Sequence, residues 1–445
     1  MYKFKEGYYV DVRIEHRYVT DISYRDGILM DMIERTTKGA LIRLFDGNMW
    51  YYASTDTLEK VQEEIDRLYL LTKPNKDILE NKTVKLFEIN KEEKYIYKDN
   101  STLNTSTKEK DELMRNYFSL IKNFDEVKMW SGKYVDRHSD FEFYSSLGSK
   151  LKYDFQTCGI AFYFALSDGK NVSQIGWDKG HTEIEGLKNC GEEMTESLKE
   201  YIYFMKNAVE VKPGEYEVIF SPIASGVFAH ESFGHKSEAD LMMGDEAAKK
   251  EWAIGAKIGS EVLSIVDEGD IPCSGYVPYD DEGTKSQKIY LIKNGILSGR
   301  LHSASTATLF EEKTTGNARS INTEYEPIVR MRATYIAPTN QTKENLFKDV
   351  KHGYYIKKIS HGSGMTQFTI APTISYEIVD GKITKPVKIS VVTGNVFETL
   401  GLITGVANDL TLLTFVLGGC GKMEQVNLPV AIGGPHIKVS KMKVQ

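Results

Sequence analysis

The chain has 445 residues, of which 41% are hydrophobic and 27% charged. This balance is typical of a folded protein and excludes global disorder, and the length exceeds what one hydrophobic core supports, so at least two lobes are expected. Asp and Glu total 63 against 56 Lys and Arg, giving a net charge of -7, which argues against nucleic acid as a partner.

Neither a membrane segment nor a cysteine framework is predicted. Residues 1–5 lack the apolar core of a signal peptide, and the most apolar stretch, 400–419, is interrupted by Asn408 and Asp409. We therefore expect a cytoplasmic protein without a membrane span. The cysteines form no short pair, so neither a disulfide framework nor a zinc ribbon is expected. They are Cys158, Cys190, Cys273 and Cys420.

Residues 8–52 are predicted to form an antiparallel meander. Short strand-like runs alternate there, at 8–14, 27–33, 40–45 and 49–54, with Asp-Gly pairs at 26–27 and 46–47 as hairpin turns. A helix at 55–71 follows, with apolar residues at helical spacing, and it is expected to cover the sheet. The polar stretch at 72–111 is interpreted as a connecting segment.

Two further helices and a strand are predicted before the middle of the chain. Helical spacing indicates a helix at 108–124 and a longer one between Cys190 and Val209, while residues 151–166 are typical of a strand. The helix between Cys190 and Val209 ends before a Pro-Gly pair, which we take as a domain boundary.

This boundary divides the chain into two predicted domains and gives an α+β fold class. Residues 1–212 are expected to form an N-terminal α/β domain with an antiparallel sheet and covering helices, in sub-segments at about 1–72 and 108–212. Residues 213–445 are expected to form a C-terminal β-rich domain, with a helix beginning near Pro222 and hairpins around Asn-Gly and Asp-Gly turns.

That helix contains the most informative motif, with His230, Glu231 and His235. Two imidazoles close together with a carboxylate beside one of them indicate a zinc site, with the glutamate as a base next to the metal. The alternative is a pair of ordinary helix histidines. Residues five apart on a regular helix lie roughly 140° apart around its axis. We therefore predict that the helix is distorted or ends around Phe233 and Gly234, by a bulge or a tightened turn, and the backbone freedom of Gly234 suits such a break.

A catalytic zinc site needs a third protein ligand, and Cys420 in the sequence LGGCGK is the best candidate. The flanking glycines would allow the backbone to approach an ion closely, and a nearby cation favours the thiolate. A buried, inert cysteine is the simplest alternative. A second alternative is a cysteine hydrolase in which Cys420 works with His436 or another histidine.

Several motifs, in this order and spacing, resemble the TldD/PmbA family of metalloproteases, and the resemblance covers nearly the whole chain. They are RDG at 25–27, FDG at 45–47, HExxxH at 230–235 continuing to Glu238 and Asp240, DDEGT at 280–284, TTGNAR at 314–319, YEPIVRM at 325–331, GKITKPVK at 381–388 and GGCGK at 418–422.

The resemblance implies an N-terminal α/β lobe, a C-terminal β-rich lobe holding the metal, and a dimer that encloses a peptide-sized cavity. It makes His230, His235 and Cys420 the zinc ligands and Glu231 the catalytic base. The family also contains a TldE-like, or PmbA-like, branch that lacks this site and pairs with an active subunit. Because this chain keeps all four residues, it resembles the active TldD-like branch.

The leading interpretation is therefore a zinc metallopeptidase that hydrolyses peptides or unfolded segments. Water activated by the metal would lose its proton to Glu231 and attack a peptide carbonyl. Glu238 and Asp240 could orient an imidazole N–H, and Arg330 and His361 could contact the substrate carbonyl or the developing oxyanion.

Two other functions remain open from the sequence. One is a non-catalytic partner subunit or peptide-binding module of a TldD/TldE-like complex. The other is a zinc amidase acting on modified small peptides, because it would use the same metal, base and water. The sequence also leaves open whether a dimer is a homodimer or a heterodimer with a related TldE/PmbA-like subunit.

Overall fold

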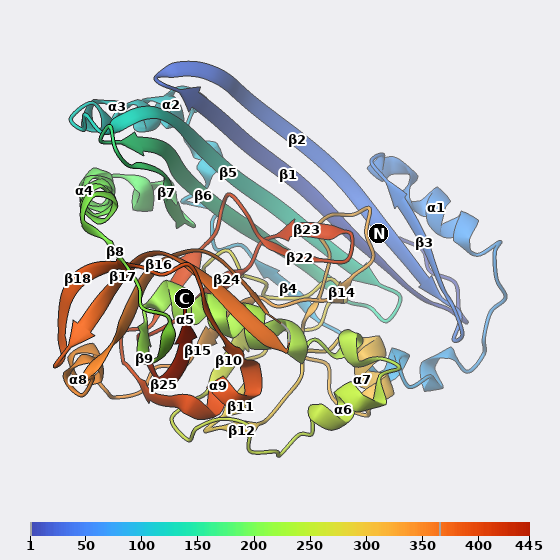
Figure 1. Cartoon of the computed structure of the whole chain (residues 1–445). Helices are drawn as coiled ribbons and strands as arrows, with labels where there is room; N and C mark the ends of the chain where they lie inside the picture. Colours follow the sequence, from blue (N-terminus) through green and yellow to red (C-terminus); the bar gives the residue numbers. More distant parts are fainter. Residues whose placement is uncertain (1, 365) are drawn as a thin grey trace.

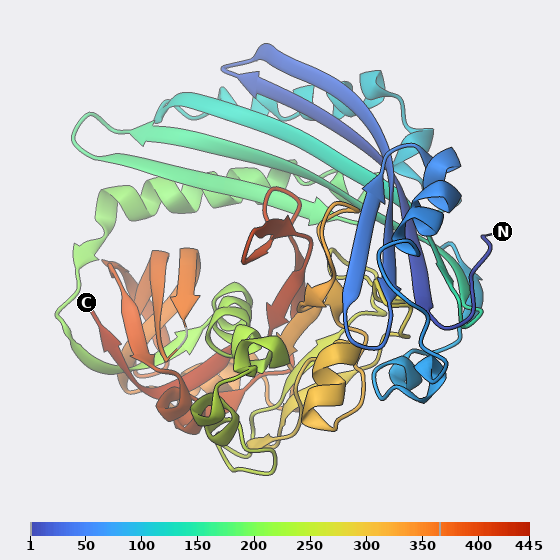
Figure 2. The ribbon, with the colours of Figure 1, turned by 90° about the vertical axis from the view of Figure 1, so that its right-hand side faces the viewer.

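The computed structural model, which describes residues 2–364 and 366–445, has the α+β fold predicted from the sequence. A long, twisted sheet from the first half of the chain arches over a second body that contains the remaining sheets (Figure 1, Figure 2). Among the helices of the described ranges, none combines the length and the apolar character needed to cross a membrane.

The arching sheet has seven strands in the order β3-β2-β1-β5-β6-β4, with β7 also paired to β6. All neighbours are antiparallel except β4 and β6. The runs predicted as separate short strands at 27–33 and 40–45 are the exposed and the buried ends of the single strand β2. The strands are β1 (Tyr9–Arg25), β2 (Ile28–Phe45), β3 (Trp50–Thr55), β4 (Lys91–Lys94), β5 (Val127–Ser145), β6 (Lys150–Ser167) and β7 (Val172–His181).

Helices cover parts of this sheet. The helix α1 (Val61–Leu68) packs on β2 and β3 through the apolar residues that the sequence indicated, and the long helix α4 (Gly191–Asn207) lies against β7. The helix predicted at 108–124 is two shorter helices, α2 (Thr107–Arg115) and α3 (Phe118–Ile121). The segment at 72–111 is more than a connection, because its Phe87 is buried and stacks on Tyr9 with ring centroids 4.1 Å apart.

In the second body, five strands close into a ring, because β16 pairs with both β9 and β17. A six-stranded sheet lies beside it, in the order β12-β11-β10-β15-β24-β21. The ring strands are β9 (Gly214–Phe220), β16 (His352–Gly364), β17 (Gln367–Val379), β19 (Val392–Asn395) and β25 (Ile437–Val444). The sheet strands are β10 (Ile265–Glu268), β11 (Ile289–Lys293), β12 (Ile296–Leu297), β15 (Ala333–Ile336), β21 (Thr411–Thr414) and β24 (Ala431–Gly434).

The helix α5 (Pro222–Val227) contacts both the ring, at β9 and β16, and the six-stranded sheet, at β15 and β24. The strand β8 (Val209–Glu210) already pairs with β18 (Lys382–Lys388) of the second body, a few residues before position 213. The remaining elements are α6 (Glu246–Glu251), α7 (Ala304–Phe310), β13 (Ala318–Arg319), β14 (Ile328–Val329), α8 (Lys343–Lys348), α9 (Val396–Leu402), β20 (Ile403–Val406), β22 (Cys420–Lys422) and β23 (Gln425–Leu428).

Buried ion pairs join the arching sheet to the second body. Arg43 on β2 donates to Asp11 at 2.7 Å and to Glu282 at 3.1 Å, and all three side chains are at most 4% exposed. Arg13 on β1 pairs with Asp281. Glu282 and Asp281 belong to the DDEGT motif, so this motif attaches the second body to the sheet.

We predict that Arg43→Met lowers the free energy of unfolding by about 3 to 5 kcal/mol, because it leaves two buried carboxylates without their cation. Denaturant unfolding followed by circular dichroism measures this loss. Lys257→Met removes an exposed ion pair with Glu261 and serves as the control, with an expected change below about 1 kcal/mol. Equal losses of stability in both variants would contradict the role assigned to the buried ion pairs.

Candidate metal centre

The helix that carries the histidines begins at a well-defined cap. Ser221 Oγ accepts a hydrogen bond from the N–H of Ala224, and Pro222 occupies the first helical turn, where no N–H is needed. Gly226 then allows a close approach to β24, because a Cβ atom at this position would lie 2.8 Å from the main-chain nitrogen of Gly433. The helix is therefore fixed against the six-stranded sheet one turn before the histidines.

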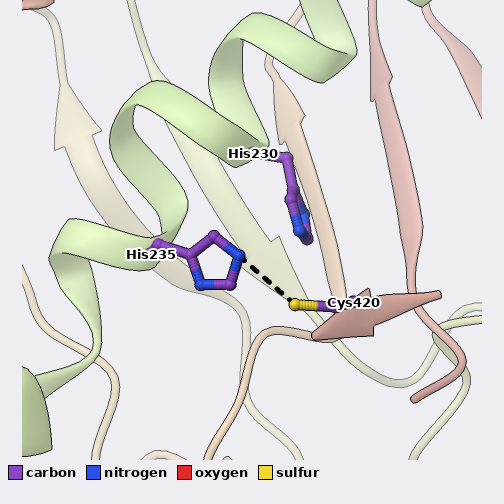
Figure 3. A group of neighbouring side chains, drawn as sticks. All are labelled: His230, His235 and Cys420. Carbon is purple, nitrogen blue, oxygen red and sulfur yellow. Dashed lines mark hydrogen bonds between the residues drawn. The ribbon is translucent and has the colours of Figure 1, made fainter. Parts of the chain in front are cut away.

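The predicted distortion is a π-helical segment, Phe228–Gly234, followed by a 3-10 turn at His235–Ser237. The N–H of His235 donates to the carbonyl of His230, which is the i to i+5 bond that defines a π turn. This bond brings residues five apart onto one face of the helix. The two imidazole rings consequently lie with centroids 5.0 Å apart and planes at 79° (Figure 3).

Gly234 lies within the distortion, but for a different physical reason than the backbone freedom that the sequence suggested. Its φ of -57° and ψ of -51° are ordinary right-handed helical values. A Cβ atom there would lie 2.1 Å from Met331 Sδ, so the packing of this buried methionine favours glycine.

Cys420 approaches the two histidines from the strand β22, almost two hundred residues further along the chain (Figure 3). Its Sγ atom lies 3.4 Å from His235 Nε2, and one ligand atom from each of the three residues falls within 4.8 Å of the others. His230 Nδ1 is buried without a hydrogen-bond partner in the described residues. Two imidazoles, one of which has an unpaired buried nitrogen, and one thiol match the donor set of a transition-metal cation such as zinc.

The hydrogen bonds among these side chains favour the metal-binding form of the cysteine. Burial alone would raise the pKa of the Cys420 thiol, but hydrogen bonds with His230 and His235 lower this pKa to about 5. Burial would likewise lower the pKa of His235, whereas hydrogen bonds with Cys420 and Glu238 raise it to about 10. Both shifts favour a thiolate beside an imidazolium, and a cation can replace the proton between them.

Glu238 contacts one of the two imidazoles, that of His235. Its Oε2 atom is 3.1 Å from His235 Nδ1, so the carboxylate can hold the proton on that nitrogen and leave Nε2 to face Cys420. Lys422 Nζ lies 3.1 Å from the same oxygen and 2.6 Å from Asp240 Oδ1. Asp240 therefore acts on the centre through Lys422 and makes no direct contact with an imidazole.

Lys422 is a residue of the candidate centre that the sequence did not predict. It stands two positions after Cys420, and residues two apart on a strand share a face, so the spacing contained a usable signal. Its ammonium also donates to the carbonyl of Val329 at 2.8 Å, which ties β22 to β14.

Arg330 is fully buried, and it donates to the main-chain carbonyl of Cys420 at 2.7 Å and to that of Gln425 at 3.2 Å. The expected contact with substrate is therefore corrected: the guanidinium supports the β22–β23 hairpin from inside the protein. His361 is exposed on β16, and its Nδ1 is 2.9 Å from Ser360 Oγ. This exposure leaves it free to meet a ligand.

Glu231 is half-buried, and its carboxylate makes no hydrogen bond within the described ranges. A Cβ atom on Gly362 would lie 3.8 Å from Glu231 Cγ, so β16 forms one wall beside this carboxylate. His436, the named partner of Cys420 in the cysteine-hydrolase alternative, instead bonds Asp409 Oδ2 at 2.6 Å and Tyr355 at 3.0 Å.

Comparisons with known proteins agree with this architecture. The family model described as "PmbA/TldA metallopeptidase C-terminal domain" matches residues 213–445, and "PmbA/TldA metallopeptidase domain 1" matches residues 10–70. A "Metalloprotease" of Methanothermobacter thermautotrophicus is 29% identical over 98% of this chain and 95% of its own length. A "Zinc metalloprotease TldD homolog" of Saccharolobus solfataricus is 29% identical over 92% of this chain and 90% of its own length.

The same fold occurs in the crystal structure of TldE from Thermococcus kodakarensis, with a TM-score of 0.75 and 18% identity over 98% of this chain and 96% of that one. The match of the C-terminal model alone extends over more than half of the chain. This protein therefore belongs to the TldD/PmbA family, as its motifs predicted.

Proposed function

We propose that this protein is a zinc-dependent metallopeptidase that hydrolyses peptides or unfolded segments. The observation that carries the proposal is the convergence of ligand atoms from His230, His235 and Cys420 within 4.8 Å. These three residues would hold the ion, which would polarise a peptide carbonyl and acidify water. The names of the two relatives quoted above agree with this activity.

Glu231 has the position and the freedom expected of a general base. It follows the ligand His230 directly, and no described side chain competes for its oxygens. Its carboxylate would accept a proton from the attacking water and return that proton to the leaving amine. Glu238 would keep His235 in the tautomer whose Nε2 is free to bind the ion.

A cleft of about 790 Å³ between the arching sheet and the second body provides room for a peptide. Ser360 lines it, two residues before Gly362, and Leu417 lines it, three residues before Cys420. At no more than about 3.6 Å per residue, both lie within roughly 11 Å of those positions. We propose that the substrate reaches the metal centre through this cleft.

The assembly and the cellular location are further parts of the proposal. We propose a dimer, either of two copies or of one copy with a related TldE/PmbA-like subunit, in the cytoplasm. Light scattering on the isolated chain, alone and with such a relative, distinguishes a homodimer from a heterodimer. A panel of linear peptides and N-acylated amino acids separates a peptidase from an amidase.

Two observed contacts favour a second candidate function. Cys420 Sγ, His235 and Glu238 Oε2 follow one another at 3.4 and 3.1 Å, as the nucleophile, base and orienting carboxylate of a cysteine hydrolase would. That activity would survive a chelator and be abolished by thiol alkylation. A metallopeptidase loses activity in the chelator and regains it when zinc is returned.

We predict that the native protein, purified without chelator, contains close to one zinc per chain. Cys420→Ser should bind zinc at least about tenfold more weakly, because it replaces the thiolate ligand. Elemental analysis and chelator competition measure the two quantities. Cys190→Ser changes a buried cysteine outside the centre and should retain its zinc. Metal-free native protein would refute the function, and unchanged affinity in Cys420→Ser would refute the third ligand.

We predict that Glu231→Gln retains zinc within about twofold and loses at least about 100-fold in peptide hydrolysis, because the amide cannot accept the proton. The measurements are zinc content and kcat/KM on a fluorogenic peptide. Glu246→Gln, an exposed change on α6, should leave both unchanged. Full activity in Glu231→Gln would remove this residue from the mechanism.

A further inference from the structure

The strand that carries Cys420 is reached through a short segment, Thr414–Gly419, which we call the arm. The arm starts at the end of β21, where Thr414 pairs with Ala431 of β24. Phe415 N–H then donates to Ser274 Oγ at 3.2 Å. Across the described residues, we find no backbone hydrogen bond that holds Val416, Leu417 or Gly418. Another contact must therefore fix this stretch, immediately before the metal ligand.

That contact is a notch in the arching sheet, formed by Gly159 on β6 and Gly180 on β7. The two glycines are direct neighbours across the antiparallel pair, so this point of the sheet has no side chains. A Cβ atom on Gly180 would lie 2.0 Å from the carbonyl oxygen of Thr414, and one on Gly159 would lie 2.8 Å from the Cβ of Val416. Glycine within a strand commonly marks such a close approach of another backbone.

The β22–β23 hairpin, which follows the arm, is fixed by the second body. Arg330 holds the carbonyl of Cys420, and Lys422 bonds Glu238, Asp240 and the carbonyl of Val329. The arm thus spans two supports, one on each half of the molecule. In both views the β22–β23 hairpin lies between the arching sheet and the second body (Figure 1, Figure 2).

We propose that the Gly159–Gly180 notch positions Cys420 for metal binding by seating Val416, four residues before the ligand. The inference rests on the proposed function, because it takes Cys420 as a zinc ligand. The two glycines touch neither metal nor substrate, so they are positioning residues. A shift of the arm would displace Sγ relative to the fixed histidines.

The test is the zinc affinity of the full-length chain carrying Gly180→Ala, measured by competition with a chromophoric chelator. Gly176→Ala is the matched control, because it lies four residues away on the same face of β7 and its Cβ would make only a 3.4 Å contact with the Tyr163 ring. We expect Gly180→Ala to weaken zinc binding about tenfold or more and Gly176→Ala to change it less than about twofold.

Val416→Gly is the second variant, because it empties the notch without crowding and decides the question if Gly180→Ala does not fold. It should also weaken zinc binding about tenfold, with unchanged circular dichroism. In cobalt-substituted protein, the thiolate-to-metal absorption should weaken in both notch variants and persist in Gly176→Ala.

Two outcomes would overturn the inference: wild-type zinc affinity in the notch variants that fold, or an equal loss in Gly176→Ala. A different result would refute the proposed function itself, namely metal-free wild-type protein or unchanged zinc affinity in Cys420→Ser. The experiments therefore distinguish a wrong role for the notch from a wrong assignment of the metal site.

Discussion

The candidate metal centre depends on a single main-chain hydrogen bond, from the N–H of His235 to the carbonyl of His230. In a regular α-helix that N–H would bond the residue four positions back, and the second imidazole would turn away from the first. The π turn inserts one residue and places both rings on one face. Such turns are rare and poorly packed on their own, so neighbouring contacts must stabilise this one. Ser221 caps the helix before it, and close packing at Gly226 and Gly234 holds it in place.

The second constraint is charge. Glu238 is fully buried, and its carboxylate is balanced by the Lys422 ammonium on one side and the His235 ring on the other. Burial raises the pKa of Glu238, but His235 and Lys422 hold it below its usual value. Because Lys422 comes from the cysteine strand, the same ion pair that keeps Glu238 ionised also brings Cys420 to the histidines. Removing either partner would leave an uncompensated buried charge.

The sequence predicted the three candidate ligands and the local distortion of the helix, and it missed the long-range contacts that support them. The five-residue spacing of the histidines was enough to predict a distorted helix, because the geometry of a helix is fixed. The inward role of Arg330 and the support from Lys422 could not be derived, since both depend on contacts between segments roughly 90 to 180 residues apart. The same limit explains β2. The sequence predicted two short strands there, but tertiary packing makes them the exposed and the buried parts of one strand.

Because the candidate ligands lie far apart in the sequence, metal binding would stabilise the folded chain. A metal held by His230, His235 and Cys420 would cross-link a loop of almost two hundred residues, and loops of this length are costly to close. An ion that binds only the folded chain adds about 2.7 kcal/mol when its concentration is one hundred times its Kd. This gain is available only when the hairpin has already docked on the π turn. The buried Glu238–Lys422 pair supplies that docking from within the protein, so the thiolate and the imidazoles meet before an ion arrives.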